Sequence, residues 1–303
     1  MIDRKTVFIN VTSKCNLSCH YCFYKIEQKR YVSDSLTKHV IFTILRSVKE
    51  YNFNEASFTG GEPLLRKDLF ECVAFAHKLG FITSIDTNGT LLDRNCIEKL
   101  VKSGTDSVYV SLDDLDGSSH NITRGHHGKT MQGIKYLAET KVGIYISTTV
   151  NALNFDRIIE LCKFSEKIGA KIIFQPVFIP LDNPLFDHLS LQSLRLDQKK
   201  VLEDQLSYYG RKFYVREYIK LFLSCVLGSG KKPSTCSQGE KSLVIDSNGD
   251  VYPCFHRREL VAGNVFETNW IDMFKKLRTL RKKNKNADCF GEHCVSLFCP
   301  FNL

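Results

Sequence analysis

Six apolar runs rich in β-branched residues, each followed by a helical pattern, divide the first part of the chain into repeating units of strand and helix. The runs are residues 6–11, 55–58, 81–86, 107–111, 143–150 and 171–174. Such nearly continuous apolar strands alternating with helices predict a parallel sheet covered by helices. Six units are two fewer than in the complete eight-unit barrel. We therefore expect an α/β fold, a partial (βα)₆ TIM-like barrel whose site lies at the carboxyl ends of the strands.

The alternation stops after Pro176. Two helical patterns follow, at residues 190–209 and 217–226, and then two short strands, at residues 243–246 and 251–254. Asn248-Gly249 between these strands is typical of a tight turn. We expect residues 1–214 to form the barrel with a following helical connection. Residues 215–303 would be a small cysteine-rich extension, a β-hairpin plus a helix.

The chain has 42 Lys and Arg against 33 Asp and Glu, a formal charge of +9. Much of the excess lies between Lys275 and Lys285, where apolar residues from Trp270 onward have helical spacing. This pattern predicts an amphipathic helix with a solvated basic face, and no nucleic-acid motif accompanies it. We find neither a signal peptide nor an apolar run long enough to span a membrane, which predicts a cytoplasmic protein without a membrane partner.

Twelve cysteines in a cytoplasmic chain of 303 residues favour ligation of a metal or cluster over disulfides. Cys15, Cys19 and Cys22 follow the first strand with the spacing C-x₃-C-x₂-C. Three thiolates can each hold one iron of a cubane and leave the fourth iron open to a ligand. A zinc knuckle that includes His20 is the alternative, although this spacing is not standard for zinc.

With the aromatic Tyr21 before its last cysteine, this motif resembles the signature of the radical S-adenosylmethionine (SAM) superfamily. The resemblance implies a [4Fe–4S] cluster on the three cysteines, with its open iron bound by SAM. It also implies that one electron, from a reducing partner such as flavodoxin or ferredoxin, cleaves SAM to methionine and a 5′-deoxyadenosyl radical. That radical would abstract a hydrogen atom from the substrate.

Polar residues at the ends of the later strands extend this resemblance over about residues 5–180. Gly60-Gly61-Glu62 resembles the GGE motif, which implies contacts to the SAM ammonium. Arg124 resembles the arginine that pairs with the SAM carboxylate. The other implied contacts to SAM or substrate are Asn88, Ser111, Asp113, Thr148, Asn151 and Gln175. Turns, a helix cap and a surface arginine remain structural alternatives for several of these residues.

A second set of cysteines lies in the extension. Cys236, Gly249 and Cys254 have the spacing C-x₁₂-G-x₄-C, which resembles the opening of the SPASM and twitch extensions of the same superfamily. The later Cys289, Cys294 and Cys299 depart from the full SPASM pattern. Because five cysteines cannot fill two four-cysteine clusters, we expect one auxiliary [4Fe–4S] cluster, on the first two cysteines and two of the last three. A second, incompletely ligated cluster and a zinc ribbon are the alternatives.

Four cysteines remain. Cys72, Cys96 and Cys162 fall on helical patterns and are expected to be small buried hydrophobes. Cys225 ends an apolar helix, where a core role is the simple interpretation. Resemblance to radical SAM epimerases implies a second possible role for Cys225, that of a thiol that returns a hydrogen atom to the substrate radical. Cys225, or the unassigned one of the last three cysteines, is therefore the candidate catalytic residue.

The resemblance implies an enzyme of natural-product maturation that epimerises or crosslinks a ribosomal peptide. The positive charge suits an acidic leader peptide. Dehydrogenation or epimerisation of an aminoglycoside or sugar-like small molecule is the alternative, since we expect no leader-binding domain before the cysteine loop. An alternative from another class is a zinc-binding structural module without catalysis.

Overall fold

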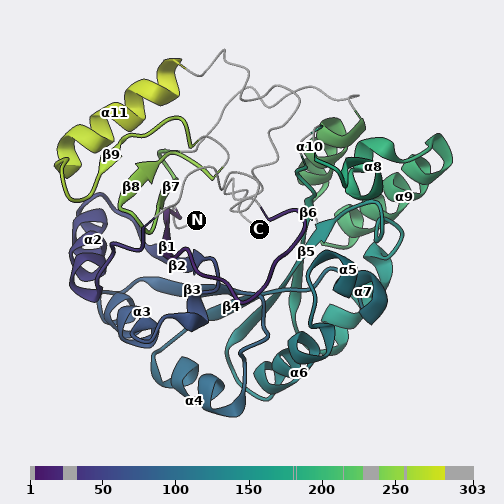
Figure 1. Cartoon of the computed structure of the whole chain (residues 1–303), viewed down its shortest axis with the longest axis horizontal. Coiled ribbons are helices and arrows are strands. Elements are labelled where there is room, and N and C mark those ends of the chain that lie inside the picture. Colours follow the sequence, from purple (N-terminus) through teal and green to yellow (C-terminus); the bar gives the residue numbers. More distant parts are fainter. Residues whose placement is uncertain are drawn as a thin grey trace.

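The computed structural model describes residues 4–22, 33–179, 181, 183–213, 215–227, 239–255 and 258–283. Six parallel strands form a curved sheet: β1 (Thr6–Thr12), β2 (Glu55–Gly60), β3 (Ile82–Thr87), β4 (Ser107–Ser111), β5 (Gly143–Val150) and β6 (Lys171–Pro176). Helices on its convex side are α2 (Lys38–Glu50), α3 (Leu69–Lys78), α4 (Arg94–Lys102), α6 (His127–Ala138) and α7 (Ile158–Lys167) (Figure 1). The predicted partial barrel is confirmed, and every predicted strand ends within two residues of the observed one.

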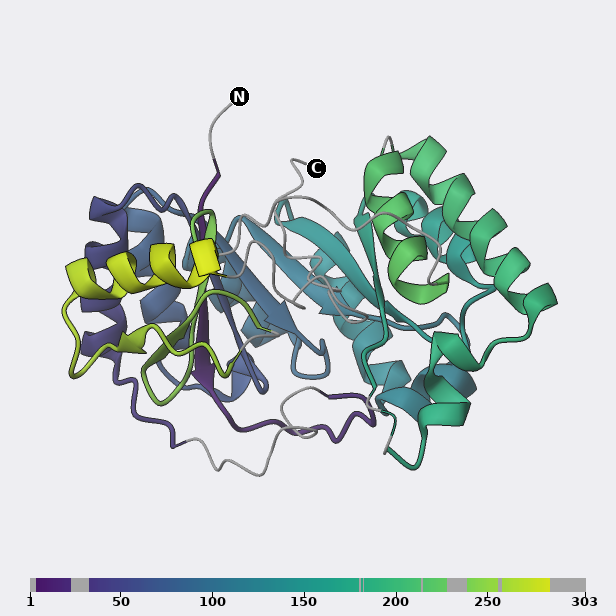
Figure 2. The same ribbon diagram turned by 90° about the horizontal axis from the view of Figure 1, so that it is seen from above.

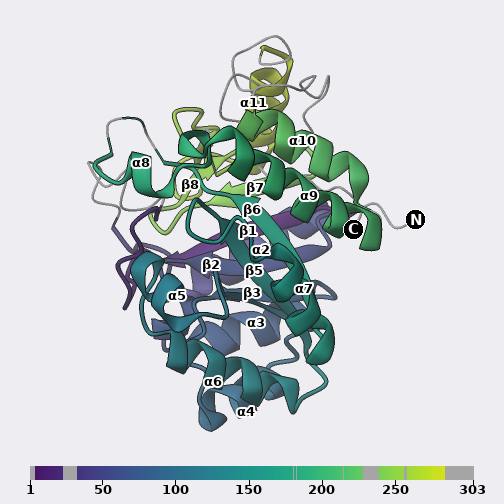
Figure 3. The same ribbon diagram turned by 90° about the vertical axis from the view of Figure 1, so that its right-hand side faces the viewer.

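Shorter elements and the C-terminal part complete the fold. The short helices are η1 (Pro63–Leu65), α5 (Gly117–Thr123), α8 (Phe186–Leu189) and η2 (Leu191–Ser193). After β6 come α9 (Leu196–Lys212), α10 (Arg216–Leu227), β7 (Ser242–Ile245), β8 (Asp250–Tyr252), β9 (Gly263–Asn264) and α11 (Trp270–Lys283). Helices α9 and α10 lie beside α7 and β6 at one end of the sheet (Figure 3).

Side-chain caps start several of the helices where the sequence supplies Thr or Asp. Thr37 caps α2 by accepting from the Val40 N–H, and Asp93 caps α4 by accepting from the Cys96 N–H at 2.7 Å. Each cap satisfies a backbone donor that the first helical turn leaves without a partner. The helices then bury one apolar face against the sheet, as Ile41 and Leu45 of α2 do.

The hairpin of the extension is joined to the barrel rather than separate from it. Strand β7 pairs in parallel with β1, with Thr6 opposite Ser242 and Ile9 opposite Ile245, and β8 and β9 continue the same sheet in antiparallel fashion. Helix α11 packs next to the end of α2, where Tyr51 and Phe274 stack at 3.9 Å (Figure 2). The hairpin and the amphipathic helix are confirmed, and this pairing holds the start of the cysteine loop between two neighbouring strands.

The later strands are not apolar on both faces, contrary to the expectation of nearly continuous apolar runs. In β3 to β6, buried residues alternate with half-buried ones. The buried ones, such as Val108 and Ile146, pack with the helices. The half-buried ones, which include Asp86, Tyr109 and Gln175, lie on the other face. A partial barrel leaves its concave side incompletely filled, so polar side chains are tolerated there.

Within these described residues, no helix is both long enough and apolar enough to cross a bilayer.

Candidate functional site

The loop after β1 carries the three cysteines of the first motif. Cys15 is exposed, while Cys19 and Cys22 are half-buried. The Cys22 N–H donates to the Cys19 carbonyl oxygen at 3.2 Å, and the Leu17 N–H donates to Cys15 Sγ at 3.4 Å. In the part of the chain that the structure describes, no three His, Cys, Asp or Glu side chains are gathered closely enough for a single metal ion. A cubane does not require that, because each thiolate binds a different iron. Three accessible soft donors therefore fit a [4Fe–4S] cluster.

Burial and a neighbouring cation have opposite effects on the pKa of these thiols. Burial raises the pKa of Cys15 and of Cys19. At Cys19, the Arg124 guanidinium acts in the other direction and favours the thiolate. A cation beside a ligand thiolate compensates part of the cost of its burial.

Gly60 and Gly61 allow the loop after β2 to lie directly against the start of the cysteine loop. The Gly61 N–H donates to the Thr12 carbonyl at 2.8 Å, and the Glu62 N–H donates to the Lys14 carbonyl at 2.8 Å. A Cβ on Gly60 would lie 2.3 Å from the Thr12 oxygen, and one on Gly61 would lie 2.2 Å from the Lys14 oxygen. Gly60 also has φ of +135°, which L side chains rarely adopt. These glycines therefore set the position of the chain that leads into Cys15.

The Glu62 carboxylate is fully buried and holds the next strand end. It accepts from the Thr87 hydroxyl at 2.7 Å, from the Asn88 N–H at 2.8 Å and from the Leu64 N–H at 3.1 Å. Burial raises the pKa of Glu62 to about 7, although the three hydrogen bonds act against that rise. In this structure the carboxylate serves three donors of the chain itself, and its contact to a SAM ammonium stays a prediction.

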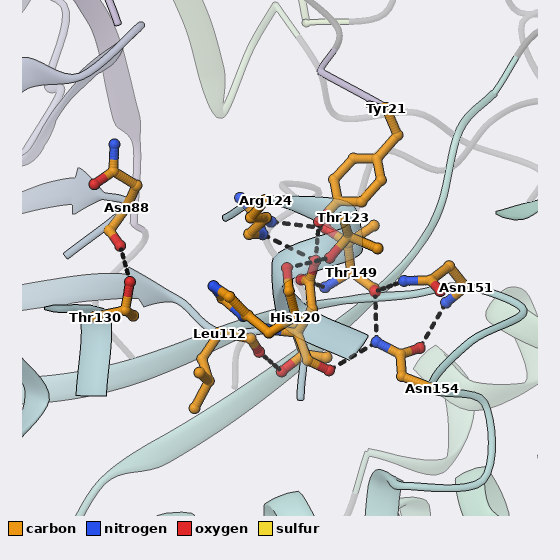
Figure 4. Close-up of polar contacts among 12 residues, drawn as sticks. Tyr21, Asn88, Leu112, His120, Thr123, Arg124, Thr130, Thr149, Asn151 and Asn154 are labelled. Atoms are coloured by element: carbon orange, nitrogen blue, oxygen red, sulfur yellow. Dashed lines mark hydrogen bonds and ion pairs between the residues drawn. The ribbon is translucent and has the colours of Figure 1, made fainter. Parts of the chain in front are cut away.

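Asn88, just after β3, lies beside the first cysteine. Its Nδ2 donates to Asn16 Oδ1 at 2.9 Å and lies 4.0 Å from Cys15 Sγ. Its backbone carbonyl accepts from the Thr130 hydroxyl at 3.0 Å (Figure 4). The end of β3, the cysteine loop and α6 are thus tied together at Asn88.

Asp113, just after β4, is the centre of a buried polar network. One carboxylate oxygen, Oδ2, accepts from the Tyr21 hydroxyl, accepts from the Thr123 hydroxyl at 2.9 Å and forms an ion pair with Arg124 Nε at 3.0 Å. The other oxygen accepts from the Thr149 N–H at 3.1 Å. Figure 4 shows these side chains pointing toward one another. Two predicted site residues, Asp113 and Arg124, are therefore in direct contact.

Arg124 lies between the cysteine loop and β5, with 13% of its side chain exposed. Its guanidinium lies 5.2 Å from the Tyr21 ring centroid, an arrangement favourable for a cation–π contact, and one of its terminal nitrogens donates to the Thr149 hydroxyl at 3.2 Å. The Asp113 carboxylate keeps its pKa far above the usual range despite the burial, so the guanidinium is permanently charged.

The remaining predicted contacts divide into two groups. Thr148 and Asn151 are buried, and their side chains bond to the backbone: the Thr148 hydroxyl donates to the Leu112 carbonyl at 2.6 Å, and Asn151 Nδ2 donates to the Thr149 carbonyl at 3.0 Å. Ser111 and Gln175 are half-buried at the ends of β4 and β6. The structure places all four at the carboxyl edge of the sheet.

The sequence interpretation missed three residues of this network. His120 and Thr123 are buried on α5, and Asn154 follows β5. The Asp113 N–H donates to His120 Nδ1 at 3.2 Å, and Asn154 Nδ2 donates to the Asp113 carbonyl at 2.7 Å. Burial lowers the pKa of His120 to about 4, so the ring is a neutral acceptor. The spacing of His120, Thr123 and Arg124 by three and four residues, which puts them on one side of a helical turn, was the available indication.

The second cysteine set lies largely beyond the described part of the chain. Cys254, just after β8, is buried. The predicted ligands outside the described residues are Cys236, Cys289, Cys294 and Cys299. Cys225 falls in α10, but its side chain is also outside the described part. Of the other cysteines, Cys72 and Cys162 belong to the hydrophobic core, which confirms the expectation for these two. Cys96 is half-buried and packs against the core.

Comparison with known proteins agrees with these features. The sequence pattern of the radical SAM superfamily matches residues 9–165, and that of the SPASM iron–sulfur cluster-binding domain matches residues 236–295. The AdoMet-dependent heme synthase of Nitratidesulfovibrio vulgaris is 30% identical over 55% of this chain and 46% of its own length. AlbA of Bacillus subtilis, the antilisterial bacteriocin subtilosin biosynthesis protein, is 24% identical over 96% of this chain and 64% of its own. SkfB of the same organism, the sporulation killing factor maturation protein, is 25% identical over 94% of this chain and 68% of its own length. The chain thus spans less than two thirds of the first two relatives.

Solved structures share the fold. The structure of anSMEcpe with bound AdoMet has a TM-score of 0.71 at 21% identity and covers 93% of this chain and 84% of that one. Streptococcus suis SuiB bound to precursor peptide SuiA has a TM-score of 0.69 at 20% identity and covers 89% of this chain and 64% of that one. BtrN in complex with AdoMet and 2-DOIA has a TM-score of 0.54 at 17% identity and covers 96% of this chain and 91% of that one. The superfamily pattern covers half of the chain, including all three cysteines of the first motif. The chain therefore belongs to the radical SAM superfamily and carries a C-terminal SPASM iron–sulfur cluster-binding domain.

Proposed function

We propose that this radical SAM enzyme epimerises or crosslinks a ribosomal peptide in the maturation of a natural product. The proposal rests on the similarity to AlbA and SkfB over 96% and 94% of this chain; their names describe bacteriocin biosynthesis and maturation of a sporulation killing factor. The shared fold of SuiB, which was solved with a precursor peptide, supports the same substrate class. The formal charge of +9 suits an acidic leader.

The first site in this proposal is the carboxyl edge of the barrel. Cys15, Cys19 and Cys22 would hold a [4Fe–4S] cluster, and Arg124 would pair with the SAM carboxylate. When bound, the cluster and SAM supply the radical that abstracts a substrate hydrogen. Asn88, which lies beside Cys15, would orient the ligand at this edge. The loop of Gly60, Gly61 and Glu62, which bonds to the start of the cysteine loop, would support the cluster there.

The second site in the proposal is an auxiliary cluster in residues 215–303. Cys254 and Cys236 would provide two ligands, and two of Cys289, Cys294 and Cys299 would provide the others. Strand β7 connects this domain to β1, which ends three residues before Cys15. The shared sheet fixes the hairpin relative to the edge at which the substrate hydrogen would be abstracted. An electron donor such as flavodoxin or ferredoxin completes the proposal.

A second candidate is dehydrogenation or epimerisation of an aminoglycoside or sugar-like metabolite. One observation favours it: the chain spans 91% of BtrN but only 64% of AlbA. BtrN was solved with a small molecule, 2-DOIA, rather than with a peptide. The half-buried polar residues on the concave face, such as Asp86, would suit either kind of polar substrate.

The test is turnover of candidate substrates by the reduced, reconstituted enzyme with SAM in D₂O. Epimerisation of a peptide through a thiol adds one deuterium per event, since the thiol hydrogen exchanges with solvent. Crosslinking instead removes two hydrogen atoms and adds no deuterium. Either mass change in a leader-bearing precursor peptide supports the proposal. Turnover of an aminoglycoside with no change in any precursor peptide would replace it with the second candidate.

A further inference from the structure

The Asp113 carboxylate is held by four contacts inside the protein. Its Oδ2 accepts from the Tyr21 and Thr123 hydroxyls and pairs with the Arg124 guanidinium, and its Oδ1 accepts from the Thr149 N–H. The side chain is only 1% exposed. Because these groups enclose the carboxylate, Asp113 is placed to act through its neighbours.

Those neighbours hold the segment between two cysteines. Only His20 and Tyr21 separate Cys19 from Cys22. The Tyr21 hydroxyl donates to Asp113, and the His20 N–H donates to the Thr123 carbonyl at 3.1 Å. Thr123 itself donates to Asp113. Both intervening residues are therefore attached, directly or through one residue, to the same carboxylate.

The same carboxylate orients Arg124. The ion pair at 3.0 Å is made by Nε, whose N–H does not point directly at the oxygen, so it is charge attraction rather than an aligned hydrogen bond. The hydrogen bond from Nη2 to the Thr149 hydroxyl and the contact with the Tyr21 ring hold the guanidinium in two further places. One buried carboxylate thus sets both the cysteine segment and the cation next to it.

We infer that Asp113 is a positioning residue that holds the Cys19–Cys22 segment and the Arg124 guanidinium in one arrangement, so that the cluster and the SAM carboxylate are bound together. The inference rests on the proposed function for its SAM-dependent half. Its structural half, the attachment of the Cys19–Cys22 segment to Asp113, is independent of the proposed function. Both halves require that Tyr21 and Asp113 act as a unit.

The structural half is tested by hydrogen exchange in the full-length chain before cluster reconstitution. Asp113→Asn and Tyr21→Phe should each speed exchange in residues 19–22 by about threefold to tenfold, as the loss of one net hydrogen bond predicts. Tyr209→Phe is the matched control, because its buried hydroxyl donates to the Ile172 carbonyl at 3.0 Å, away from this site. If Asp113→Asn does not fold, Tyr21→Phe alone carries the test. Unchanged exchange in a folded variant would overturn the inference.

The functional half is tested by SAM binding to the reconstituted protein, followed by the change that SAM causes in the EPR spectrum of the reduced cluster. Asp113→Asn should raise the SAM dissociation constant about tenfold, as for a lost hydrogen bond to a charged group, and alter that spectrum. Adding Tyr21→Phe should cost little more, because the two residues act together. Full additivity, or wild-type binding and spectrum, would contradict the inference. Wild-type protein that binds neither iron nor SAM would instead contradict the proposed function.

Discussion

The backbone N–H of Asn88 donates to Glu62 Oε2 at 2.8 Å, and this bond joins the turn after β3 to the glycine loop after β2. The glycine loop in turn bonds to Thr12 and Lys14, directly before Cys15. Three consecutive strand ends are therefore coupled through backbone hydrogen bonds and one buried carboxylate. A disturbance at any of them should reach the cysteine loop.

The burial of Glu62 predicts a specific pH dependence of stability. Its pKa rises from 4.5 to about 7 on folding, so the folded chain keeps the proton over a pH range in which the unfolded chain has lost it. The contribution of Glu62 to the free energy of unfolding is therefore fully present below pH 4.5 and is lost as pH rises through about 7. Glu62→Gln cannot titrate. The free energy of unfolding of both proteins is compared between about pH 5 and about pH 7.5. Over this range the loss in the Glu62→Gln variant should be smaller than the loss in the wild type by about 2–3 kcal/mol.

Urea unfolding of the iron-free chain at several pH values measures this difference. Glu203→Gln, at an exposed position of α9, is the control and should keep the wild-type slope. Equal slopes for wild type and Glu62→Gln would show that the carboxyl is not protonated on folding.

Gly61→Ala should separate the glycine loop from the cysteine loop. The new Cβ would lie 2.2 Å from a backbone oxygen that cannot rotate away, and forced overpacking of this kind typically costs about 1–3 kcal/mol. We expect a lower melting temperature and weaker retention of the cluster. Gly128→Ala on α6 is the matched control, since a Cβ there meets nothing within 4 Å. A Gly61→Ala variant as stable and as rich in iron as Gly128→Ala would refute the packing argument.

The pairing of β7 with β1 shows what the sequence could not reveal. The strands and helices follow from local periodicity and caps, and so they were predictable. The parallel register of Thr6 with Ser242 connects residues more than two hundred positions apart, and no local pattern encodes it. The edge position of the cysteines followed from the fold, because loops after parallel strands share one edge.

The contacts within the site show the same division. Tyr21 was recognised as part of a motif, but its bond to Asp113 depends on how the loop after β1 lies against α5, where the His20 N–H donates to the Thr123 carbonyl. His120 and Thr123 became part of the network only through that packing. The alternation in β4 and β5 departs from the expected continuous runs because the concave side of a partial barrel is not fully covered.

Cys19→Ser should remove one cluster and leave the other. A serine oxygen is a poor substitute for a soft thiolate on iron, so the iron content should fall by about four per chain. Cys96→Ser, a half-buried cysteine on α4, should keep wild-type iron. Iron and sulfide analysis after anaerobic reconstitution distinguishes the two. Equal iron in both variants would remove Cys19 from the ligand set.

Cys225→Ala separates two fates of the substrate radical. If the thiol returns a hydrogen atom, the variant should cleave SAM but form no epimerised product. Measurement of 5′-deoxyadenosine together with product, by mass spectrometry, gives both quantities. Unchanged product formation eliminates this thiol role and leaves crosslinking or dehydrogenation, or one of the last three cysteines as the donor.

Cleavage of SAM at the first cysteine motif underlies every step of the proposed reaction. The most direct measurement is mass spectrometry of the anaerobically reconstituted, reduced protein incubated with SAM alone, alongside its iron and sulfide content. We expect 5′-deoxyadenosine, iron approaching two clusters per chain, and loss of the nucleoside in Cys19→Ser. Zinc in place of iron, with no 5′-deoxyadenosine from the wild type, would contradict it.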